Sequence, residues 1–181
     1  MVSLVLIVIF ALAKSSFSSS IKGSSESNKP TLTDLLQALD TSQKIWMKVH
    51  NYAVEAVSCV YYGKISLKDN VYDFNEWYTK GDRKWSPQKA AYFMRATLSE
   101  GAEGPVMLVS YRASKAKGTP YTFRYWNPEE KCGIFTYPPD GRCEQIVWGS
   151  VVRANATSCN EAYKTICGDK RYNEYKDECG I

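Results

Sequence analysis

The chain carries few of the side chains that acid–base or metal chemistry uses. Its 181 residues include one histidine, His50, and no two cysteines stand at C-x-x-C spacing. A histidine-based catalytic group and a zinc site both lack their usual residues. Carboxylates remain, but no spacing singles out a pair of them for catalysis. We therefore expect that the chain is not an enzyme and that it uses no metal and no cofactor.

Basic and acidic side chains nearly balance. The chain has 23 Lys and Arg against 19 Asp and Glu, for a formal net charge of +4. The basic residues are scattered among acids and do not form the runs of about 5–8 residues that mark nucleic-acid or membrane-surface patches. This argues against a nucleic-acid partner. Five Trp, 13 Tyr and six Phe instead supply rings for the walls of an apolar pocket.

The first residues predict a secretory signal. Residues 2–13, VSLVLIVIFALA, form an uncharged apolar run that leads into a serine-rich stretch, as in the core and cleavage zone of a signal peptide. The run is too short to span a bilayer, which takes about 20 apolar residues. We expect a signal peptide over 1–18, cleaved between 13 and 20, then a flexible polar arm over 19–30 and one domain over 31–181. The mature protein is then extracellular, with no membrane segment.

Secretion changes the interpretation of the six cysteines, because an oxidising compartment favours disulfides. Their number and their spacing predict three bridges, but spacing alone does not choose the pairing. The cysteines are Cys59, Cys132, Cys143, Cys159, Cys167 and Cys179. Asn155 begins an Asn-Ala-Thr sequon, which predicts a glycan on the surface.

The periodicity predicts an all-β domain flanked by helices. One short helix begins near Thr33-Asp34, and another covers 158–166 before a short terminal strand or arm. Eight β-type stretches separated by turn signals lie between them: 45–52, 57–67, 71–79, 89–98, 105–112, 119–126, 132–137 and 143–152. In the third, Tyr72, Phe74, Glu76 and Tyr78 share one face, and in the sixth Tyr121, Phe123 and Tyr125 do. Eight antiparallel strands in meander order can close a barrel around side chains or one small ligand.

Several segments resemble the salivary lipocalins of ticks, the group that includes the histamine-binding proteins. These segments are IWMKVHNY, CVYYGK, FRYWN, EEKCGIFTYPPDGRCEQIVW and CNEAYKTIC, and the resemblance covers about Asp34 to Cys179. It implies a lipocalin-type barrel of eight antiparallel strands, with a short N-terminal helix, a C-terminal helix and a disulfide-tethered tail. Trp46 looks like the barrel-closing Trp of lipocalins, with Lys44 in place of the usual Gly.

The resemblance also implies a disulfide pairing and a role. By position in the family, Cys59 pairs with Cys179 and Cys132 with Cys159, which leaves Cys143 with Cys167. The implied role is that of a monomer in tick saliva that sequesters a small host inflammatory mediator.

The amine-binding members of this family carry a Cys-Asp-aliphatic pattern followed by Glu-Leu-aromatic. This chain keeps the glutamate as Glu144, but it has Gly133 in place of the aspartate and Gln145-Ile146 in place of the last pair. Trp148, on the same strand face as Glu144, is the candidate replacement ring.

A buried ammonium loses its hydration and needs ionised carboxylates in return. Glu76 or Asp73, of which only one can face inward, is the candidate second acid. The resulting candidate site for histamine or serotonin consists of Glu144, Trp148, Tyr72, Phe74, Glu76, Tyr78, Phe123, Tyr125 and Trp46.

Two alternatives remain open. In the first, the barrel carries a lipid mediator such as a leukotriene, fatty acid or sterol, and Arg124 or Arg95 holds its head group. Strand parity sets Arg124 opposite Phe123 and Tyr125, so that they do not all line one cavity. In the second, the outer surface acts on a host protein or immune cell through the polar arm, the loop 113–118 and the glycan.

Overall fold

The computed structural model describes residues 29–81, 88–114 and 116–180. The predicted signal peptide, its cleavage zone and nearly all of the polar arm lie outside these residues. No helix in the described part of the chain is long and apolar enough to cross a membrane.

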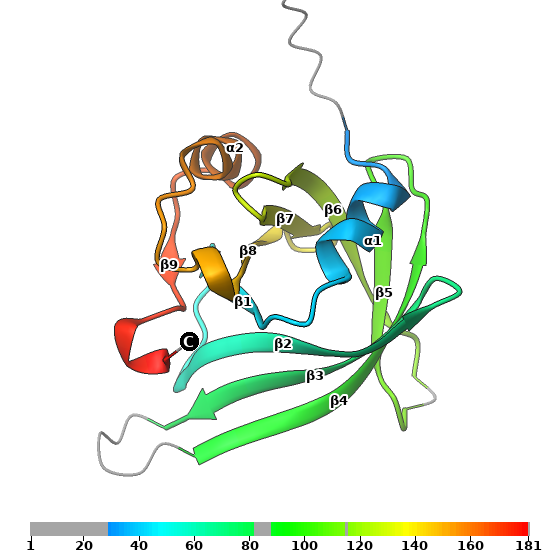
Figure 1. The fold of residues 1–181 in the computed structure, drawn as a ribbon, viewed down its shortest axis with the longest axis horizontal. Coiled ribbons are helices and arrows are strands. Elements are labelled where there is room, and N and C mark those ends of the chain that lie inside the picture. The colour runs from blue at the N-terminus through cyan, green and yellow to red at the C-terminus, as the bar shows by residue number, and fades with distance from the viewer. Residues whose placement is uncertain (1–28, 82–87, 115, 181) are drawn as a thin grey trace, which may run out of the picture.

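The strands close into an antiparallel barrel, as the sequence predicts (Figure 1). Its elements are α1 (Leu32–Leu39), β1 (Ile45–His50), β2 (Val57–Lys68), β3 (Val71–Lys80), β4 (Gln88–Ser99), β5 (Val106–Tyr111), β6 (Thr119–Asn127), β7 (Cys132–Tyr137), β8 (Arg142–Trp148), α2 (Thr157–Cys167) and β9 (Tyr172–Asn173). Each strand from β2 to β8 pairs with the next, and β1 pairs with both β8 and β2. The strand β9 lies outside this ring, on β1.

Helix α1 begins two residues before the predicted position. Thr31 is the N-cap: the Asp34 N–H donates to Thr31 Oγ1 at 3.2 Å, and the Thr31 N–H donates to Asp34 Oδ2 at 2.7 Å. This reciprocal pair satisfies two N–H groups that the first turn leaves free. Leu35, Ala38 and Leu39 are fully buried in the barrel core, so α1 contributes part of the inner packing.

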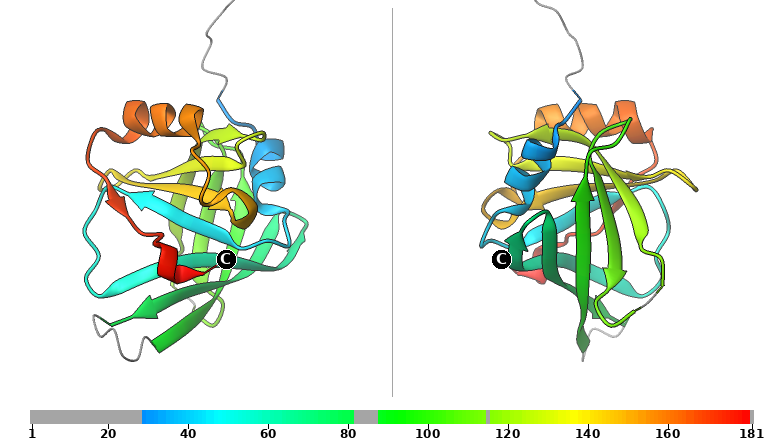
Figure 2. Two further views of the ribbon diagram at one scale, coloured as in Figure 1. Left: turned by 60° about the vertical axis from the view of Figure 1, so that its left-hand side comes forward. Right: turned by 90° about the vertical axis from the view of Figure 1, so that its right-hand side faces the viewer.

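Two apolar clusters lie on opposite faces of the barrel wall. The inner cluster joins α1 to the barrel interior and includes Ile45, Tyr72, Phe74, Phe123 and Phe135. The outer cluster packs α2 against the outside of β7 and β8 and includes Trp46, Ile134, Val147, Cys159 and Tyr163. Figure 2 shows α2 lying across the outside of the barrel.

A β-bulge corrects one expectation about side-chain faces. The register between β6 and β7 shifts between Phe123 and Tyr125. Alternation would place both rings on one face, but the bulge inserts a residue and reverses the parity beyond it. Phe123 is therefore in the inner cluster, while Tyr125 packs against the outer one.

Two predicted strands end early. The first ends at His50 rather than residue 52, where the chain bends away toward β2. The last ends at Trp148 rather than 152, because Gly149 starts a 3₁₀ turn (Gly149–Val151). The Gly149 N–H donates to Lys44 O at 2.8 Å, so this turn is tied to the residue before β1.

The structure contains the three disulfides that the resemblance implied: Cys59–Cys179, Cys132–Cys159 and Cys143–Cys167. The last two clamp α2 to β7 and β8. The first joins residues 120 apart in the sequence and fixes the C-terminal tail to β2.

That tail fills a gap in the barrel. Strands β1 and β2 pair only at Ile45 and Trp46 and then diverge. Beyond this point β9 pairs with β1, and Glu174 continues the connection: its N–H donates to Lys48 O at 3.0 Å, and its carbonyl accepts from the Cys59 N–H at 3.4 Å. The tail thus bridges the backbones of two strands that no longer pair with each other.

Candidate ligand-binding cavity

The barrel contains two adjoining, partly open cavities of about 430 Å³ each. They share Met47, Tyr52 and Glu76 in their walls. The first is also lined by Tyr62, Phe74, Met94, Met107, Val109, Ser110, Tyr111, Ser114, Ala116, Lys117, Thr119, Tyr121, Phe135, Arg142 and Glu144. The second is also lined by Val54, Glu55, Val57, Val60, Tyr78, Lys80, Tyr92 and Glu174. Each cavity is within the size range of small-ligand sites.

Glu144 is the most deeply buried acid in the wall of the first cavity, with 6% of its surface exposed. The Tyr52 hydroxyl donates to Glu144 Oε1 at 2.6 Å. Burial raises the pKa of Glu144, whereas the Tyr52 hydrogen bond and the charges of His50 and Arg142 act in the opposite direction. A carboxylate in this setting gains from a cationic partner, which would offset its lost hydration.

Glu76, on β3, is the second acid of the cavity wall. Burial and then the charge of Glu144 raise its pKa to about 7. Among the described residues, no side chain donates a hydrogen bond or forms an ion pair with Glu76. The negative charges of Glu76 and Glu144 therefore repel each other across the first cavity. This arrangement favours a positively charged occupant.

The structure brings four of the nine predicted ligand-binding residues to the cavities. Glu144 and Phe74 line the first, Tyr78 lines the second, and Glu76 lines both. They come from β3 and β8.

The other five predicted residues pack elsewhere. Tyr72 and Phe123 are buried in the inner cluster beyond the cavity walls, and Trp46 and Tyr125 belong to the outer cluster. Trp148 shares the inner face with Glu144, but its Nε1–H donates to Ala38 O at 3.0 Å. Its ring therefore fills the space under α1 and does not replace the lost aromatic of the amine pattern.

The inward acid of β3 is Glu76, and Asp73 points away from the cavities. Arg95 holds Asp73 through two hydrogen bonds, at 2.7 and 2.8 Å, and lowers the pKa of this carboxyl group. Arg124 pairs with Glu103 at 3.3 Å. Neither Arg95 nor Arg124 lines a cavity, so the cations expected to hold a lipid head group are engaged elsewhere.

Sequence reasoning missed several cavity residues. Tyr52 lies in the irregular segment after β1, and Arg142 lies at the start of β8, where alternation gives little guidance. The Arg142 guanidinium pairs with Asp140 at 2.7 Å and lies over the Tyr137 ring at 4.5 Å. Strand alternation through Tyr121 and Phe123 could have indicated Tyr121, which lines the first cavity.

A side chain at Gly133 would collide with Phe123, so the aspartate of the amine-binding pattern does not fit at this position. A Cβ atom built there would lie 2.6 Å from Phe123 Cε2 and 3.0 Å from Phe123 Cζ. We expect Gly133→Ala to lower the free energy of unfolding by about 1–3 kcal/mol through overpacking, measured by urea denaturation. Gly133→Asp should cost more and should not strengthen amine binding. A stable Gly133→Asp protein with tighter amine binding would contradict this explanation.

An eight-stranded antiparallel meander that encloses ligand-sized cavities and carries a helix outside its wall defines a lipocalin-type protein. Solved structures of tick salivary lipocalins share this fold. Japanin from Rhipicephalus appendiculatus, bound to cholesterol, superposes with a TM-score of 0.62 at 14% identity, over 77% of this chain and 97% of that one. AM182, in complex with serotonin, gives 0.57 at 11% identity, over 81% and 92%.

No protein-family model and no curated protein sequence matches the chain. The similarity to solved structures therefore establishes the fold, and the ligand must be argued from the cavity.

Proposed function

We propose that this protein binds and sequesters a small cationic biogenic amine of the histamine or serotonin type. The observation that carries the proposal is the pair of acids, Glu76 and Glu144, in the wall of one cavity. Tyr52, Tyr62, Phe74 and Tyr121 surround them. Ring faces and carboxylates together suit a flat molecule that bears an ammonium group.

The proposed mode of action is binding without turnover. A protein that removes a mediator in this way must bind it at submicromolar strength and be present in at least equal amount. AM182, of the same fold, was solved with serotonin, which supports an amine as one ligand class that this architecture accommodates. The neighbours of known ligand are binding proteins, which supports a role other than catalysis.

The test is calorimetric titration of the refolded protein with serotonin, histamine, cholesterol and a leukotriene. We expect submicromolar binding of at least one of the two amines. Binding of cholesterol or the leukotriene alone would overturn the proposal in favour of a lipid carrier. No heat with any of the four would favour a role of the protein surface toward a host protein.

Amine binding should depend on pH through Glu76. Its pKa of about 7 lies above its ordinary value, so the neutral form predominates below pH 7 and the ionised form above it. A cation prefers the ionised form, so affinity should fall as the pH drops from 8 to 6, and binding at pH 7 should release about half a proton. Titrations in buffers of different ionisation enthalpy measure this number, and a value of zero would contradict it.

A lipid ligand is the alternative that one observation favours. Met47, Met94 and Met107 contribute flexible apolar wall to the first cavity, and Arg142 and Lys117 lie in the same wall. Methionines adapt to ligands of different shape, and a cation suits an acidic head group. Japanin, of the same fold, was solved with cholesterol. Glu76 and Glu144, which form no ion pair with another described residue, favour the amine, because beside an apolar chain their charges would have no cationic partner.

We also propose that the protein is secreted into tick saliva, as a monomer, after removal of the predicted signal peptide. The three disulfides support an oxidising compartment. Asn155 is exposed just before α2, and its Nδ2, the atom that would carry a glycan, donates to Thr157 Oγ1 at 3.3 Å. Mass analysis of protein secreted from insect cells, before and after glycosidase treatment, tests both the cleavage and the glycan.

A further inference from the structure

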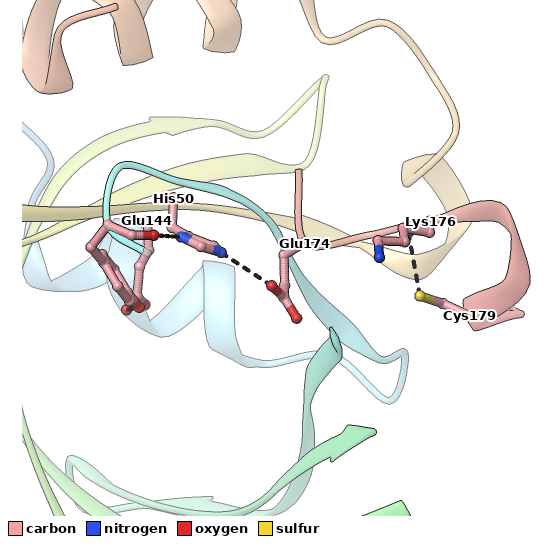
Figure 3. Close-up of polar contacts among 6 residues, drawn as sticks. His50, Glu144, Glu174, Lys176 and Cys179 are labelled. Carbon is pink, nitrogen blue, oxygen red and sulfur yellow. Dashed lines mark hydrogen bonds and ion pairs between the residues drawn. The ribbon is translucent and has the colours of Figure 1, made fainter. Parts of the chain in front are cut away.

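His50, the single histidine of the chain, joins the C-terminal tail to the ligand cavity. Its ring is buried, with 3% of the residue exposed. Tyr52 and Tyr172 lie on either side of it, at ring distances of 4.7 and 5.7 Å. Figure 3 shows the ring pointing toward Glu174 of the tail, with Glu144 of the cavity on its other side.

Both nitrogens of the His50 ring face oxygen atoms. Nδ1 lies 2.6 Å from the Tyr52 carbonyl oxygen, which can only accept, so Nδ1 carries a hydrogen. Nε2 lies 3.1 Å from Glu174 Oε2. When Glu174 is ionised, Nε2 must also carry a hydrogen, and the ring is then an imidazolium cation.

The tail holds this carboxylate firmly. Glu174 has 5% of its surface exposed, and its backbone bonds to Lys48 and Cys59 on either side. Oε2 meets His50, while Oε1 is buried without a hydrogen-bond partner among the described residues. A buried carboxylate with one free oxygen depends on its cationic partner, so the two groups favour each other's charged form.

The charge of His50 reaches the acid of the cavity. His50 and Glu144 are direct partners across β1 and β8, and the positive charge of His50 favours the ionised form of Glu144. Tyr52 connects them a second time: its carbonyl accepts from His50 and its hydroxyl donates to Glu144.

Other charged groups around this site lie on four parts of the chain. Glu55, in the segment after β1, and Lys80, at the end of β3, line the second cavity together with Glu174. Arg142, on β8, acts on Glu144 in the same direction as His50. Glu76, on β3, shares the cavity wall with Glu144. Lys176 follows on the tail, and it lines the same surface hollow as His50 and Glu174.

We propose that Glu174 is a positioning residue for the amine site: it holds His50 as a cation, and this cation keeps Glu144 ionised for the ligand. The inference rests on the proposed function for the identity of the ligand. The contacts of His50 with Glu174, Tyr52 and Glu144 support the remainder. The tail would thus tune the pH range in which the cavity accepts an ammonium group.

The first test needs no ligand. Because the chain has one histidine, NMR titration of its imidazole carbons reports on His50 alone. We expect the ring to lose its proton at a lower pH in Glu174→Gln than in the wild type. The matched control is Glu178→Gln, which removes an exposed acid from the same tail and should leave the titration unchanged. Identical curves for the wild type and Glu174→Gln would overturn the inference.

The second test measures serotonin and histamine affinity from pH 5.5 to 8.5. Glu174→Gln should move the pH midpoint of amine binding, to which Glu76 and Glu144 both contribute, upward by about half a pH unit. This shift is less than the ~1–3 units expected for the loss of a single close opposite charge, because the substitution removes a negative charge as well. Affinity near pH 6.5 should then fall about threefold while affinity at pH 8.5 is retained. His50→Gln, which removes the positive charge and leaves the Glu174 carboxylate, should shift the midpoint in the same direction by at least as much, and the double variant should match Glu174→Gln.

The outcomes separate the two proposals. If the wild type binds an amine and Glu174→Gln follows the same pH profile, the tail inference fails while the proposed function stands. If the wild type binds no amine at any pH, the proposed function fails, and the NMR titration still decides whether Glu174 sets the charge of His50. An equal loss of affinity at every pH would mean a structural role for Glu174, or a direct contact with the ligand from the wall of the second cavity, and would also overturn the inference.

Discussion

Glu144→Gln is expected to weaken the binding of serotonin or histamine by at least about 30-fold. The substitution keeps the size of the side chain and an oxygen that can accept from Tyr52, but it removes the charge that would face the ammonium group. Truncating one partner of a buried, hydrogen-bonded charge pair costs about 2–5 kcal/mol. Calorimetric titration at pH 8 measures the loss, because Glu76 is then mostly ionised.

This loss should come without loss of stability. Burial raises the pKa of Glu144, so its ionised form is less favourable in the folded than in the unfolded protein, and that cost grows as the pH rises. Glu144→Gln should therefore unfold at the same temperature as the wild type or higher. Glu161→Gln, an exposed change on α2, is the control and should alter neither property. Unchanged amine affinity in Glu144→Gln would remove Glu144 from the site.

Replacing Cys59 and Cys179 together by Ala is expected to lower the free energy of unfolding by up to about 4–5 kcal/mol. The bridge joins residues 120 apart. In the chain-entropy model, a disulfide that closes a longer loop removes more conformational entropy from the unfolded chain and therefore stabilises the folded protein more. Urea denaturation of the oxidised proteins measures the difference. Because the same bridge holds Glu174 near His50, this variant should also show the histidine titration of Glu174→Gln.

A loss below about 1 kcal/mol would contradict this expectation. It would mean that the pairing of β9 with β1 and the backbone bonds of Glu174 already hold the tail without the covalent link. Amide hydrogen exchange at positions 59 and 174, whose backbones bond to each other, distinguishes a tail that stays in place in the variant from one that detaches.

The strands of the barrel were predictable because alternation and turn residues mark them locally. The disulfide pairing followed from the family resemblance. Side-chain faces were reliable only along unbroken strands. On β3 the alternation correctly separates Glu76 from Asp73, whereas on β6 the bulge after Phe123 sends Tyr125 to the outside. Bulges depend on the partner strand, and the periodicity of one strand cannot contain them.

The missed part of the site lies where no periodicity exists. Tyr52 follows the end of β1, and Glu174 follows a strand of two residues. Both owe their position to contacts more than 90 residues away in sequence, namely Tyr52 with Glu144 and Glu174 with His50. The single histidine, His50, is too little for histidine-based catalysis, but one imidazole suffices to place a charge beside the cavity.

The acids of the cavity show that the position of a residue in the fold predicts the site better than the sequence pattern does. At Gly133 a side chain would collide with Phe123, so the local pattern cannot carry a second acid there. Glu76 supplies an acid from a different strand, β3. It comes well before Gly133 in the sequence but lies in the wall of the same cavity as Glu144. Several strands form the walls of the cavity, so an acid at an inward-facing position on any of them can supply the same charge.

The tail that bridges β1 and β2 also constrains the order of folding. Cys59 of β2 is synthesised 120 residues before its partner Cys179. Until the tail emerges, the backbones of β1 and β2 beyond Trp46 therefore have nothing to bridge them. Contacts of such long sequence separation form late and slow the final step. During that interval the exposed edges of β1 and β2 could pair with another chain. Oxidation that forms Cys59–Cys179 promptly would then protect yield as well as stability.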